Sequence, residues 1–342
     1  MKRCISMTCT VLQKGQVNMP KVTLVEAITL AHAWEMSHDP SVVALGEDVG
    51  KNGGVFRATQ GLQEKFGANR VIDTPLAEGM IAGLCVGMAA QGLKPVAEIQ
   101  FMGFIYPAVD QIVNHMTRLR NRTRGRLTCP VVIRTPHGGG IHSPEHHSES
   151  VESMFCHMPG LRVVCPSSPA RAYGLLLAAI REPDPVLFLE PVRIYRYAKQ
   201  EVEDNGAALP LDVCYVLREG TDCTIVTWGA MTVECLKAAT ELQSQNVSVE
   251  VIDLATISPI DADTILESVA KTGRLVIVHE AARNVGVGAE IAAIVAEHGL
   301  YDLEAPVQRV TGYDTIVPMA PLEHDYVPSV ARIVDAVRKT IS

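Results

Sequence analysis

The stretch Val71-Ile72-Asp73-Thr74-Pro75-Leu76-Ala77-Glu78-Gly79-Met80 decides the fold, because it joins a short strand to the start of a helix. Val71 and Ile72 are β-branched residues, which are typical of strands. The small and apolar residues from Gly79 to Gly92 then predict a buried helix. A second apolar segment at 96–104 begins as another strand. Strand, helix and strand in this order are typical of a parallel α/β sheet.

Glu78 is the unusual residue of this stretch, because it places a carboxylate at the start of an apolar helix. One interpretation is structural: an acidic residue in the first turn complements the positive end of the helix dipole. The other is chemical: a carboxylate beside an apolar pocket and an aromatic ring can have a raised pKa and transfer protons. Spacing alone favours the structural interpretation.

Composition limits the class of protein. The chain has 342 residues, of which 47% are hydrophobic, and a net charge of −8. Its length suggests two domains, and the scattered charge argues against nucleic acid or an anionic membrane as partner. No apolar run approaches the roughly 18 residues of a transmembrane helix. The nine cysteines stand singly, which predicts reduced thiols in a cytosol-like compartment.

The chain divides into four parts by pattern. Residues 1–19 contain Lys2, Arg3 and Lys14 but no apolar core, so we expect a disordered leader and not a secretory signal. Residues 20–200 alternate strands with helices and predict an α/β domain with a mostly parallel sheet covered by helices. Residues 201–212 predict a linker. Residues 213–342 predict a second, smaller α/β domain of the same kind.

The expected elements follow from periodicity and capping. Thr23 with Glu26 predicts a capping box for a helix that ends near Met36. Further helices are expected from Thr232, from Asp261, after Gly288 and from Pro328. Strands are expected at 42–45, 71–72, 96–99, 131–134, 162–164, 186–189, 224–227, 249–253, 275–279 and 307–310.

Three motifs invite other interpretations. Gly286-Val287-Gly288 faintly resembles a dinucleotide fingerprint, but the third glycine is missing, which argues against nicotinamide binding. His142 and His146 suggest zinc, yet Pro144 between them prevents an ordinary helix from presenting both on one face. For Trp228 and His279, at strand ends of the second domain, we expect hydrogen-bonded structural roles.

A glycine-rich segment, Pro136-His137-Gly138-Gly139-Gly140, follows the strand expected at 131–134. Loops at the carboxyl end of a parallel sheet are where ligands bind. His147 follows in the same loop and is a candidate acid or proton donor near neutral pH. A surface histidine without a chemical role is the alternative.

Nine short motifs stand in a fixed order along the chain. They are Gly46-Glu47-Asp48-Val49, Gly53-Gly54-Val55-Phe56-Arg57, Asp73-Thr74-Pro75-Leu76, Glu98-Ile99-Gln100-Phe101, Asp110-Gln111-Ile112, His147-Ser148, Pro159-Gly160-Leu161, Asp184-Pro185-Val186 and Gly312-Tyr313-Asp314-Thr315. Together they resemble the beta subunit of the thiamine-diphosphate-dependent 2-oxo acid dehydrogenases, the pyruvate, branched-chain and acetoin group. The resemblance runs from about Pro20 to Ile341. It implies a transketolase-like pyrimidine-binding domain followed by a transketolase C-terminal domain.

The resemblance also implies that this chain carries half of an active site. The sequence has no Gly-Asp-Gly followed by an Asn some two dozen residues later. In the family that motif holds magnesium and the diphosphate of thiamine diphosphate, and it belongs to the alpha subunit. The implied partners are therefore an alpha subunit, in an assembly of two alpha and two beta chains, and a dihydrolipoyl acyltransferase core. The chain should be active only with the alpha subunit.

The family's functional residues match positions in this sequence. Glu78 matches the carboxylate that hydrogen-bonds the cofactor's aminopyrimidine ring. The resemblance therefore favours the chemical interpretation of Glu78 over the structural one. Phe104 matches the aromatic residue that stacks on that ring, where other members carry Tyr. His147 matches the histidine that assists acyl transfer to a lipoyl group, with His142 and His146 as weaker alternatives. The remaining pocket positions are Glu47, Leu76 and Gln100.

A structural potassium ion is implied at a second place, through backbone oxygens and two side chains. The matching positions are Val131, Ala179, Ile180, Glu182 and Asp184. Glu182 and Asp184 depart from the Asp and Asn expected of some relatives. Both still offer oxygens, but the longer side chain and the added charge change the geometry available to the ion.

The resemblance leaves the 2-oxo acid open. Residues 138–145 look more like bacterial pyruvate members, whereas Val251-Ile252-Asp253-Leu254 and residues 312–315 lean toward branched-chain ones, so pyruvate is weakly favoured. Branched-chain 2-oxo acids and acetoin are the alternatives. Two other classes are a complete one-chain transketolase and a non-catalytic interaction subunit with the same fold. The expected location is the cytoplasm of a bacterium, or the mitochondrial matrix of a eukaryote.

Overall fold

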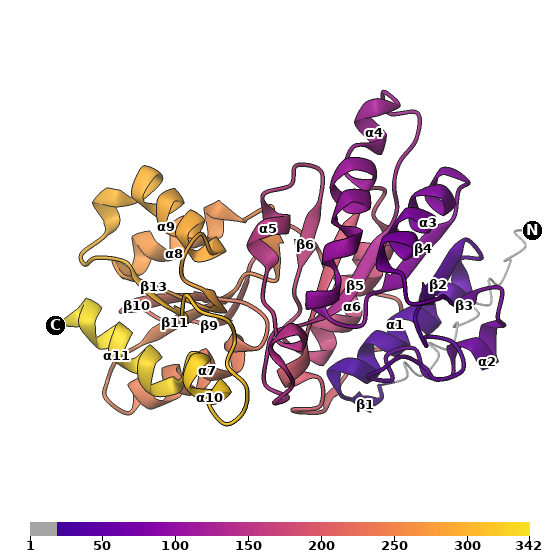
Figure 1. Cartoon of the computed structure of the whole chain (residues 1–342). Helices are drawn as coiled ribbons and strands as arrows, with labels where there is room; N and C mark the ends of the chain where they lie inside the picture. The colour runs from indigo at the N-terminus through magenta and orange to yellow at the C-terminus, as the bar shows by residue number, and fades with distance from the viewer. Residues whose placement is uncertain (1–18) are drawn as a thin grey trace, which may run out of the picture.

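A computed structural model describes residues 19–342 as two α/β domains side by side (Figure 1). The expected leader lies, apart from its last residue, outside these described residues. Each domain is built on one mostly parallel sheet with helices on both faces, so the predicted fold class is confirmed. The C-terminal domain lies on the left in Figure 1 and the N-terminal domain on the right.

The first sheet has seven strands in the order β12-β6-β7-β5-β4-β2-β3. Its strands are β2 (Val42–Gly46), β3 (Val71–Asp73), β4 (Lys94–Glu98), β5 (Val132–His137), β6 (Arg162–Val164), β7 (Val186–Pro191) and β12 (Thr256–Ser258). All neighbouring pairs are parallel except β12 with β6. Parallel neighbours bring their carboxyl ends to one edge of the sheet, where ligands usually bind.

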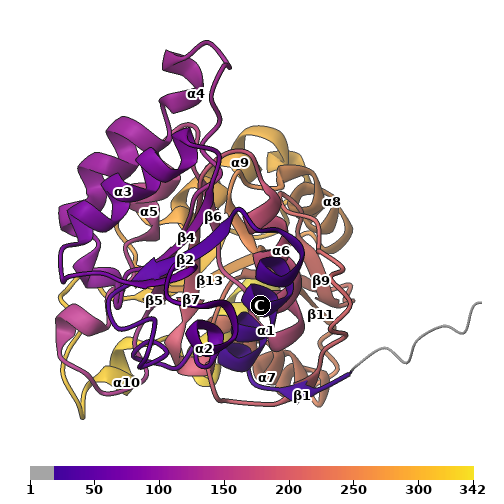
Figure 2. The same ribbon diagram turned by 90° about the vertical axis from the view of Figure 1, so that its right-hand side faces the viewer.

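Helices cover this sheet on both faces, as Figure 2 shows along its edge. The helices of this half are α1 (Leu24–His38), α2 (Leu62–Phe66), α3 (Glu78–Ala90), α4 (Leu119–Arg122), α5 (Glu152–Cys156) and α6 (Pro169–Arg181). α1 and α6 pack together over one face, and α3 covers the other. Val42 and Ala44 enter the core on the first side, whereas Leu45 enters the core on the second. Burial on both faces explains why the strands are apolar throughout.

The second sheet has five strands in the order β14-β13-β10-β11-β9. These are β9 (Tyr215–Arg218), β10 (Cys223–Thr227), β11 (Val249–Asp253), β13 (Leu275–Ala282) and β14 (Gln308–Gly312), and only β9 runs antiparallel. The helices are α7 (Met231–Gln243), α8 (Ala262–Thr272), α9 (Val287–His298), α10 (Glu323–Tyr326) and α11 (Val330–Ile341). α7 packs with α11, and α8 packs with α9.

Several details differ from the sequence expectations. β9 and β12 were not predicted, and β12 takes three residues of the second half of the chain into the first sheet. Residues 102–116 form short 3₁₀ and π-helical turns: η1 (Met102–Phe104), η2 (Tyr106–Ala108) and η3 (Gln111–Met116). Further 3₁₀ turns are η4 (Glu145–His147), η5 (Val192–Ile194) and η6 (Leu300–Asp302). The expectation that 79–92 is a buried helix is wrong for one face, because Met80 and Leu84 are exposed.

The segment between the two domains is packed against the first domain. It follows β8 (Gln200–Glu201), which pairs with β1 (Lys21–Val22). The Leu209 N–H donates to the Gly174 carbonyl of α6 at 3.0 Å. The Tyr173 hydroxyl donates to Asp204 at 2.9 Å. These contacts hold the segment against α6, although it contains no helix or further strand before β9.

Candidate active site

Three neighbouring strands end at the edge where the predicted cofactor residues lie. Gly46 of β2 is paired with Asp73 of β3 on one side and with Glu98 of β4 on the other. Glu47 comes directly after β2, and Glu78 begins α3 after the turn that follows β3. Gln100 comes just after β4. The strand order therefore brings together residues that are separated by up to about 50 positions in the sequence.

The loop that carries Glu47 is fixed to the turn that leads to Glu78. The Gly50 N–H donates to Asp73 Oδ1 at 2.6 Å, and the Thr59 hydroxyl donates to the Val49 carbonyl at 2.7 Å. Hydrogen bonds from a backbone N–H to a carboxylate are among the stronger ones in proteins. The Asp73-Thr74-Pro75-Leu76 motif therefore ties these two loops together at one edge.

Glu47 and Glu78 form an acidic pair at this edge. Both side chains are half-buried. Burial raises the pKa of Glu47, and the neighbouring carboxylates of Asp48 and Glu78 raise it further. Among residues 19–342, neither Glu47 nor Glu78 takes part in a salt bridge or a side-chain hydrogen bond. Such a pair, with its oxygens open, can accept hydrogen bonds or exchange protons with a ligand.

Phe104 and His147 lie against each other beside this edge. Their ring centroids are 5.1 Å apart with an interplanar angle of 76°. Phe104 ends η1, and His147 ends η4, which packs directly on η1. This packing needs Gly103, because a Cβ there would collide with the carbonyl oxygen of His146. The sequence-predicted stacking residue and the predicted proton donor are thus brought together.

Phe101 is a neighbour of His147 that the sequence reasoning did not single out. Its ring centroid lies 4.4 Å from that of His147, and 5.5 Å from that of Phe104. Phe101 is buried, so it supports both rings from below. Its signal in the sequence was its place in the Glu98-Ile99-Gln100-Phe101 motif, which gave no role to the aromatic residue.

His147 has a buried polar atom without a partner. Its Nδ1 is shielded from solvent and has no hydrogen-bond partner within the described residues. The same is true of the hydroxyl oxygens of Thr74, Ser148 and Ser150. Buried polar atoms are usually paired, so each unpaired one needs a reason. An orphaned ring nitrogen at the edge that carries Glu78 is one mark of a site completed by a ligand or a partner.

The other two candidate histidines have different surroundings. His146 is half-exposed, with its Nδ1 3.7 Å from Glu149, and Glu149 also accepts the Tyr106 hydroxyl. His142 is exposed, and its Nδ1 lies 3.0 Å from Glu323 of the C-terminal domain. Of the three histidines, His147 alone packs on both Phe101 and Phe104.

A buried ion cluster lies beneath the site. Arg134 on β5 donates from Nε to Glu190 at 2.6 Å and from Nη1 to Glu98 at 3.0 Å. The Tyr195 hydroxyl donates to the same Glu190 carboxylate. All four side chains are almost fully buried. Burial raises the pKa of Glu98, while the Arg134 guanidinium opposes that rise.

The face of α3 beyond Glu78 is apolar and open. Leu76 is 71% exposed, and Met80 and Leu84 are 44% and 42% exposed. Leu76, a predicted pocket residue, therefore presents its side chain to solvent in the single chain. Contiguous exposed apolar residues next to a site are typical of a surface that a partner covers.

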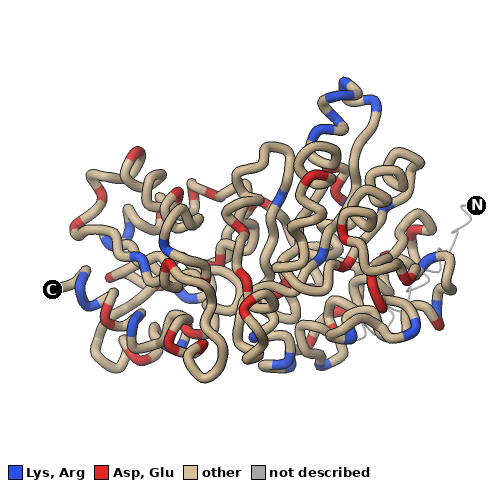
Figure 3. The backbone as a smooth tube through the Cα atoms, in the orientation of Figure 1, with Lys and Arg blue, Asp and Glu red and all other residues tan. Residues whose placement is uncertain are grey.

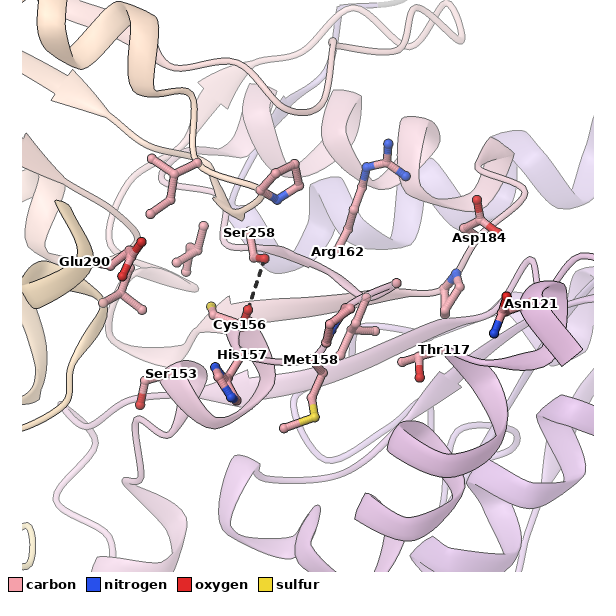
Figure 4. Close-up of a pocket in the computed structure, with 18 of the residues that line it drawn as sticks. Thr117, Asn121, Ser153, Cys156, His157, Met158, Arg162, Asp184, Ser258 and Glu290 are labelled. Atoms are coloured by element: carbon pink, nitrogen blue, oxygen red, sulfur yellow. Dashed lines mark hydrogen bonds between the residues drawn. The ribbon is translucent and has the colours of Figure 1, made fainter. Parts of the chain in front are cut away.

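A large cavity lies elsewhere, between the two domains (Figure 4). Its volume is about 1420 Å³, and its walls come from residues 117–125, 153–162, 184–185, 257–260 and 285–294. Ser258 stands opposite Cys156 there and donates to the Cys156 carbonyl at 3.4 Å. Glu47, Glu78, Phe104 and His147 do not line it. The predicted site is therefore separate from this cavity.

The positions predicted for potassium gather at one corner of the first sheet. The Val131 carbonyl accepts from the Val186 N–H at 2.9 Å. Glu182 is bound by Arg162 at 2.8 Å, and Asp184 by Arg120 at 2.7 Å. Arg120 belongs to the arginine-rich segment around α4 that projects at the top of Figure 3. Each ion pair occupies one carboxylate oxygen and leaves the other for a further ligand.

Metal-binding clusters and membrane-spanning helices are both absent from residues 19–342. Within residues 19–342, no group of three or more His, Cys, Asp and Glu side chains is placed to hold a metal ion. In the same part of the chain, no helix has the length and hydropathy needed to cross a membrane.

Family models match both halves of the chain. The model described as "Transketolase, pyrimidine binding domain" matches residues 20–198, and "Transketolase, C-terminal domain" matches residues 213–333. Among solved structures, the chain is similar to "Split gene transketolase, inactive beta4 tetramer" with a TM-score of 0.74. That likeness covers 94% of this chain and 99% of the other at 24% identity, and it concerns the fold.

Curated relatives extend the match over nearly the whole chain. The "Pyruvate dehydrogenase E1 component subunit beta" of Acholeplasma laidlawii is 51% identical over 321 residues, which covers 94% of this chain and 98% of the relative. The protein of the same name from Bacillus subtilis (strain 168) is 47% identical over 323 residues, covering 94% and 99%. This chain therefore belongs to the transketolase-like family of pyruvate dehydrogenase E1 beta subunits.

Proposed function

We propose that this chain supplies the pyrimidine-binding half of a thiamine diphosphate site that decarboxylates pyruvate, and that an alpha subunit supplies the other half. Membership in the E1 beta family makes the chain a component of a 2-oxo acid dehydrogenase. One observation carries the proposal further: within residues 19–342 the acidic pair of Glu47 and Glu78 has no salt bridge, and the ring pair of Phe104 and His147 has an unpaired Nδ1. The two pairs are linked through Gly79, which follows Glu78 and packs against the Pro107 carbonyl.

The residues at this edge suit an aminopyrimidine ring. When bound, thiamine diphosphate supplies a carbon nucleophile for attack on the ketone carbon of the 2-oxo acid. Glu78 would hold a ring nitrogen of the pyrimidine through its carboxylate and exchange a proton there. Phe104 offers an aromatic face, and Leu76 an apolar wall. Gln100 and Glu47 would complete the pocket, and burial together with the carboxylates of Asp48 and Glu78 raises the pKa of Glu47.

His147 is proposed to deliver a proton in the later half of the reaction. Its ring is held by Phe101 and Phe104, at 4.4 and 5.1 Å between centroids. Its orphaned Nδ1 leaves the ring free to bind a partner that this chain does not contain. In this proposal His147 assists transfer of the acyl group to the lipoyl arm of a dihydrolipoyl acyltransferase. Proton transfer by a positioned histidine typically contributes about 10²–10⁴-fold to a rate.

The open face of α3 supports the need for a second chain. Leu76, Met80 and Leu84 are exposed next to Glu78, and an apolar surface of this kind is stabilised when a partner covers it. We propose an alpha subunit as the partner that completes the cofactor site, in an assembly of two alpha and two beta chains. The relatives named above are bacterial, which favours a cytoplasmic location.

A binding experiment tests the half-site. The chain alone should bind thiamine diphosphate with magnesium weakly or not at all, and the chain co-purified with an alpha subunit should bind it tightly. Titration calorimetry on both samples measures this difference. Tight binding and full decarboxylation by the isolated chain would contradict the proposal and favour a complete one-chain enzyme.

Substrate preference needs the assembled enzyme, because its substrate pocket would be shared with the alpha subunit. Activity should be highest with pyruvate, when pyruvate, 3-methyl-2-oxobutanoate and acetoin are compared at equal concentration. A higher kcat/KM with either of the other two would move the assignment to the branched-chain or acetoin group. No activity with any of them, together with stable alpha-subunit binding, would favour a non-catalytic interaction subunit.

The potassium ion is also a proposal. The backbone oxygens of Val131, Ala179 and Ile180, with one free oxygen each on Glu182 and Asp184, would hold it. Arg120 and Arg162 already bring positive charge to this corner, so occupancy should be weak. Thermal unfolding in equal concentrations of potassium and sodium chloride tests the site: a higher Tm in potassium supports it, and equal values argue against it.

A further inference from the structure

The loop that carries His147 is closed and held from the other domain. The Gly138 N–H donates to the Glu149 carbonyl at 3.1 Å, so residues 138–149 form a loop with a hydrogen-bonded base. The sequence suggested that the glycine-rich start of this loop binds a ligand. Its backbone donors are instead occupied by carboxylates of this chain, Glu280 and Glu323.

Glu280 and Glu323 come from separate parts of the C-terminal domain. Glu280 lies on β13 and accepts the Gly139 N–H, and Glu323 begins α10 and accepts the Gly140 N–H. Glu323 also accepts the His142 N–H at 2.9 Å and lies 3.0 Å from His142 Nδ1. Both carboxylates are buried, with exposures of 7% for Glu280 and 2% for Glu323.

The run of three glycines fits this arrangement. An added Cβ on Gly138 would lie 2.9 Å from both carboxylate oxygens of Glu280, and one on Gly139 would collide with Glu323. Gly138 and Gly140 have positive φ values of 80° and 104°, which glycine adopts without strain. Side chains at these positions would push the carboxylates away from the N–H groups.

We propose that Glu280 and Glu323 are positioning residues, which fix the His147 loop and thereby hold His147 against Phe101 and Phe104. Buried carboxylates that accept backbone N–H bonds are costly to leave unpaired, so the two domains and the loop have one favoured arrangement. In this proposal the two glutamates act through the loop and not on the substrate. The consequence for acyl transfer rests on the proposed role of His147, whereas the hold on the loop does not.

The hold on the loop can be measured without any activity. In the full chain assembled with its alpha subunit, Glu323→Ala should raise amide hydrogen exchange in residues 138–147 by about tenfold or more, because local opening becomes easier. Glu280→Gln should raise it less, because an amide oxygen can still accept one N–H. Asp325→Ala is the matched control: Asp325 is exposed, stands on the same short helix and pairs with its neighbour His324.

Unchanged exchange at 138–147 in both glutamate variants would overturn the proposal. Should Glu323→Ala fail to fold, Glu323→Asp keeps the charge on a shorter side chain and should show a smaller rise. If Glu323→Asp folds without any rise, the hold on the loop is excluded.

The positioning role has a second readout, which separates it from a general loss of structure. Glu323→Ala should lower lipoyl acyl transfer at least about tenfold more than decarboxylation measured with an artificial electron acceptor. Equal losses in the two assays would overturn the positioning role. If the wild-type assembly transfers no acyl group, the proposed function fails by itself, and the exchange experiment still decides whether the loop is held.

Discussion

The carboxyl edge of the first sheet carries two pairs of glutamates in opposite environments. Glu98 and Glu190 are buried and both bind Arg134, with Tyr195 as a further donor. Glu47 and Glu78 lie at the ends of the neighbouring strands, half-buried, and form no ion pair within residues 19–342. The two pairs share residue type and sheet edge, and they differ in what surrounds them.

This difference distinguishes carboxylates that stabilise the fold from carboxylates that are available to a ligand. A carboxylate that is buried and bound by a guanidinium has its oxygens occupied, so it fixes the backbone of β4, β5 and β7 and cannot bind a ligand. A carboxylate without a cation nearby keeps its oxygens available, and a second carboxylate beside it raises its proton affinity. Glu78 and Glu47 both lack a neighbouring cation, and the pKa of Glu47 is raised by burial and by the carboxylates of Asp48 and Glu78. Glu98 does not share these surroundings, although it stands in an equally prominent sequence motif.

Removing the arginine that binds the buried pair should have the largest effect, a loss of stability of the folded protein. Arg134→Met leaves Glu98 and Glu190 buried without a cation, which typically costs about 3–5 kcal/mol. We expect a large fall in the urea midpoint, or failure to fold, monitored by circular dichroism. Arg120→Met is the matched control, because its ion pair with Asp184 is exposed, and it should leave the midpoint unchanged.

A triple variant sharpens that result. Arg134→Met combined with Glu98→Gln and Glu190→Gln removes the unpaired charges, so much of the lost stability should return. If the triple variant is as unstable as Arg134→Met alone, packing around the guanidinium and not charge accounts for the effect.

A substitution in the unpaired carboxylates, Glu47 and Glu78, should lower activity and leave the stability of the protein unchanged. Glu78→Gln keeps the shape of the side chain but removes the basic carboxylate, so decarboxylation by the assembled enzyme should fall by roughly a hundredfold or more. Folding and alpha-subunit binding should survive. Glu64→Gln, at an exposed position on α2, is the control. Activity of Glu78→Gln within a few-fold of wild type would exclude Glu78 as the activating residue.

His147 separates the two half-reactions. His147→Ala should reduce acyl transfer to the lipoyl group at least about tenfold more than decarboxylation, which an artificial electron acceptor reports alone. Equal losses would mean that His147 acts on the oxo acid itself. Wild-type rates in both assays would mean that His147 is a loop histidine without a chemical role. His146 and His142 would then need the same test.

The sequence predicted what depends on local pattern. Strands such as 42–45 were found because they are apolar on both faces, and the capping box of Thr23 and Glu26 is present in the structure. β12 was missed because three residues before Pro259 carry little periodicity, and their partner β6 lies about 90 positions earlier. The exposed face of α3 was taken as buried because apolar residues alone do not distinguish a core from an interface.

The sequence predicted those site residues that lie in motifs of the family. Residue roles at Glu78, Phe104 and His147 came from the family resemblance and stay predictions, whereas the pairing of Glu47 with Glu78 and the contact of Phe104 with His147 are findings. Phe101 and the hold of Glu323 on Gly140 could not be predicted, because they depend on contacts between segments distant in sequence. For Glu323 that separation is 183 positions.

Substitution of His279 should have the smallest effect on stability, and the effect should be visible mainly at acidic pH. His279 lies in the domain boundary, stacked on Trp228 at 5.1 Å between ring centroids. The expectation that its polar atoms are hydrogen-bonded is wrong, since neither ring nitrogen has a partner of acceptable geometry among the described residues. Gly286 and Gly288 close over its ring, which gives that glycine pair a packing role. Burial lowers the pKa of His279 to about 4 from an ordinary value of 6.5.

The sign of the pH effect follows from that lowered pKa. Between pH 6.5 and 4 the unfolded chain binds a proton at this position and the folded chain does not, so the contribution of His279 to stability is complete above pH 6.5 and is lost as the pH falls toward 4. His279→Leu should therefore flatten the fall of the free energy of unfolding, measured from urea curves, over this window by up to about 1.4 kcal/mol per pH unit, and change little at pH 8. His298→Gln, at an exposed position, should leave the acid dependence intact. The same acid slope in His279→Leu as in wild type would mean that folding does not lower the pKa of His279.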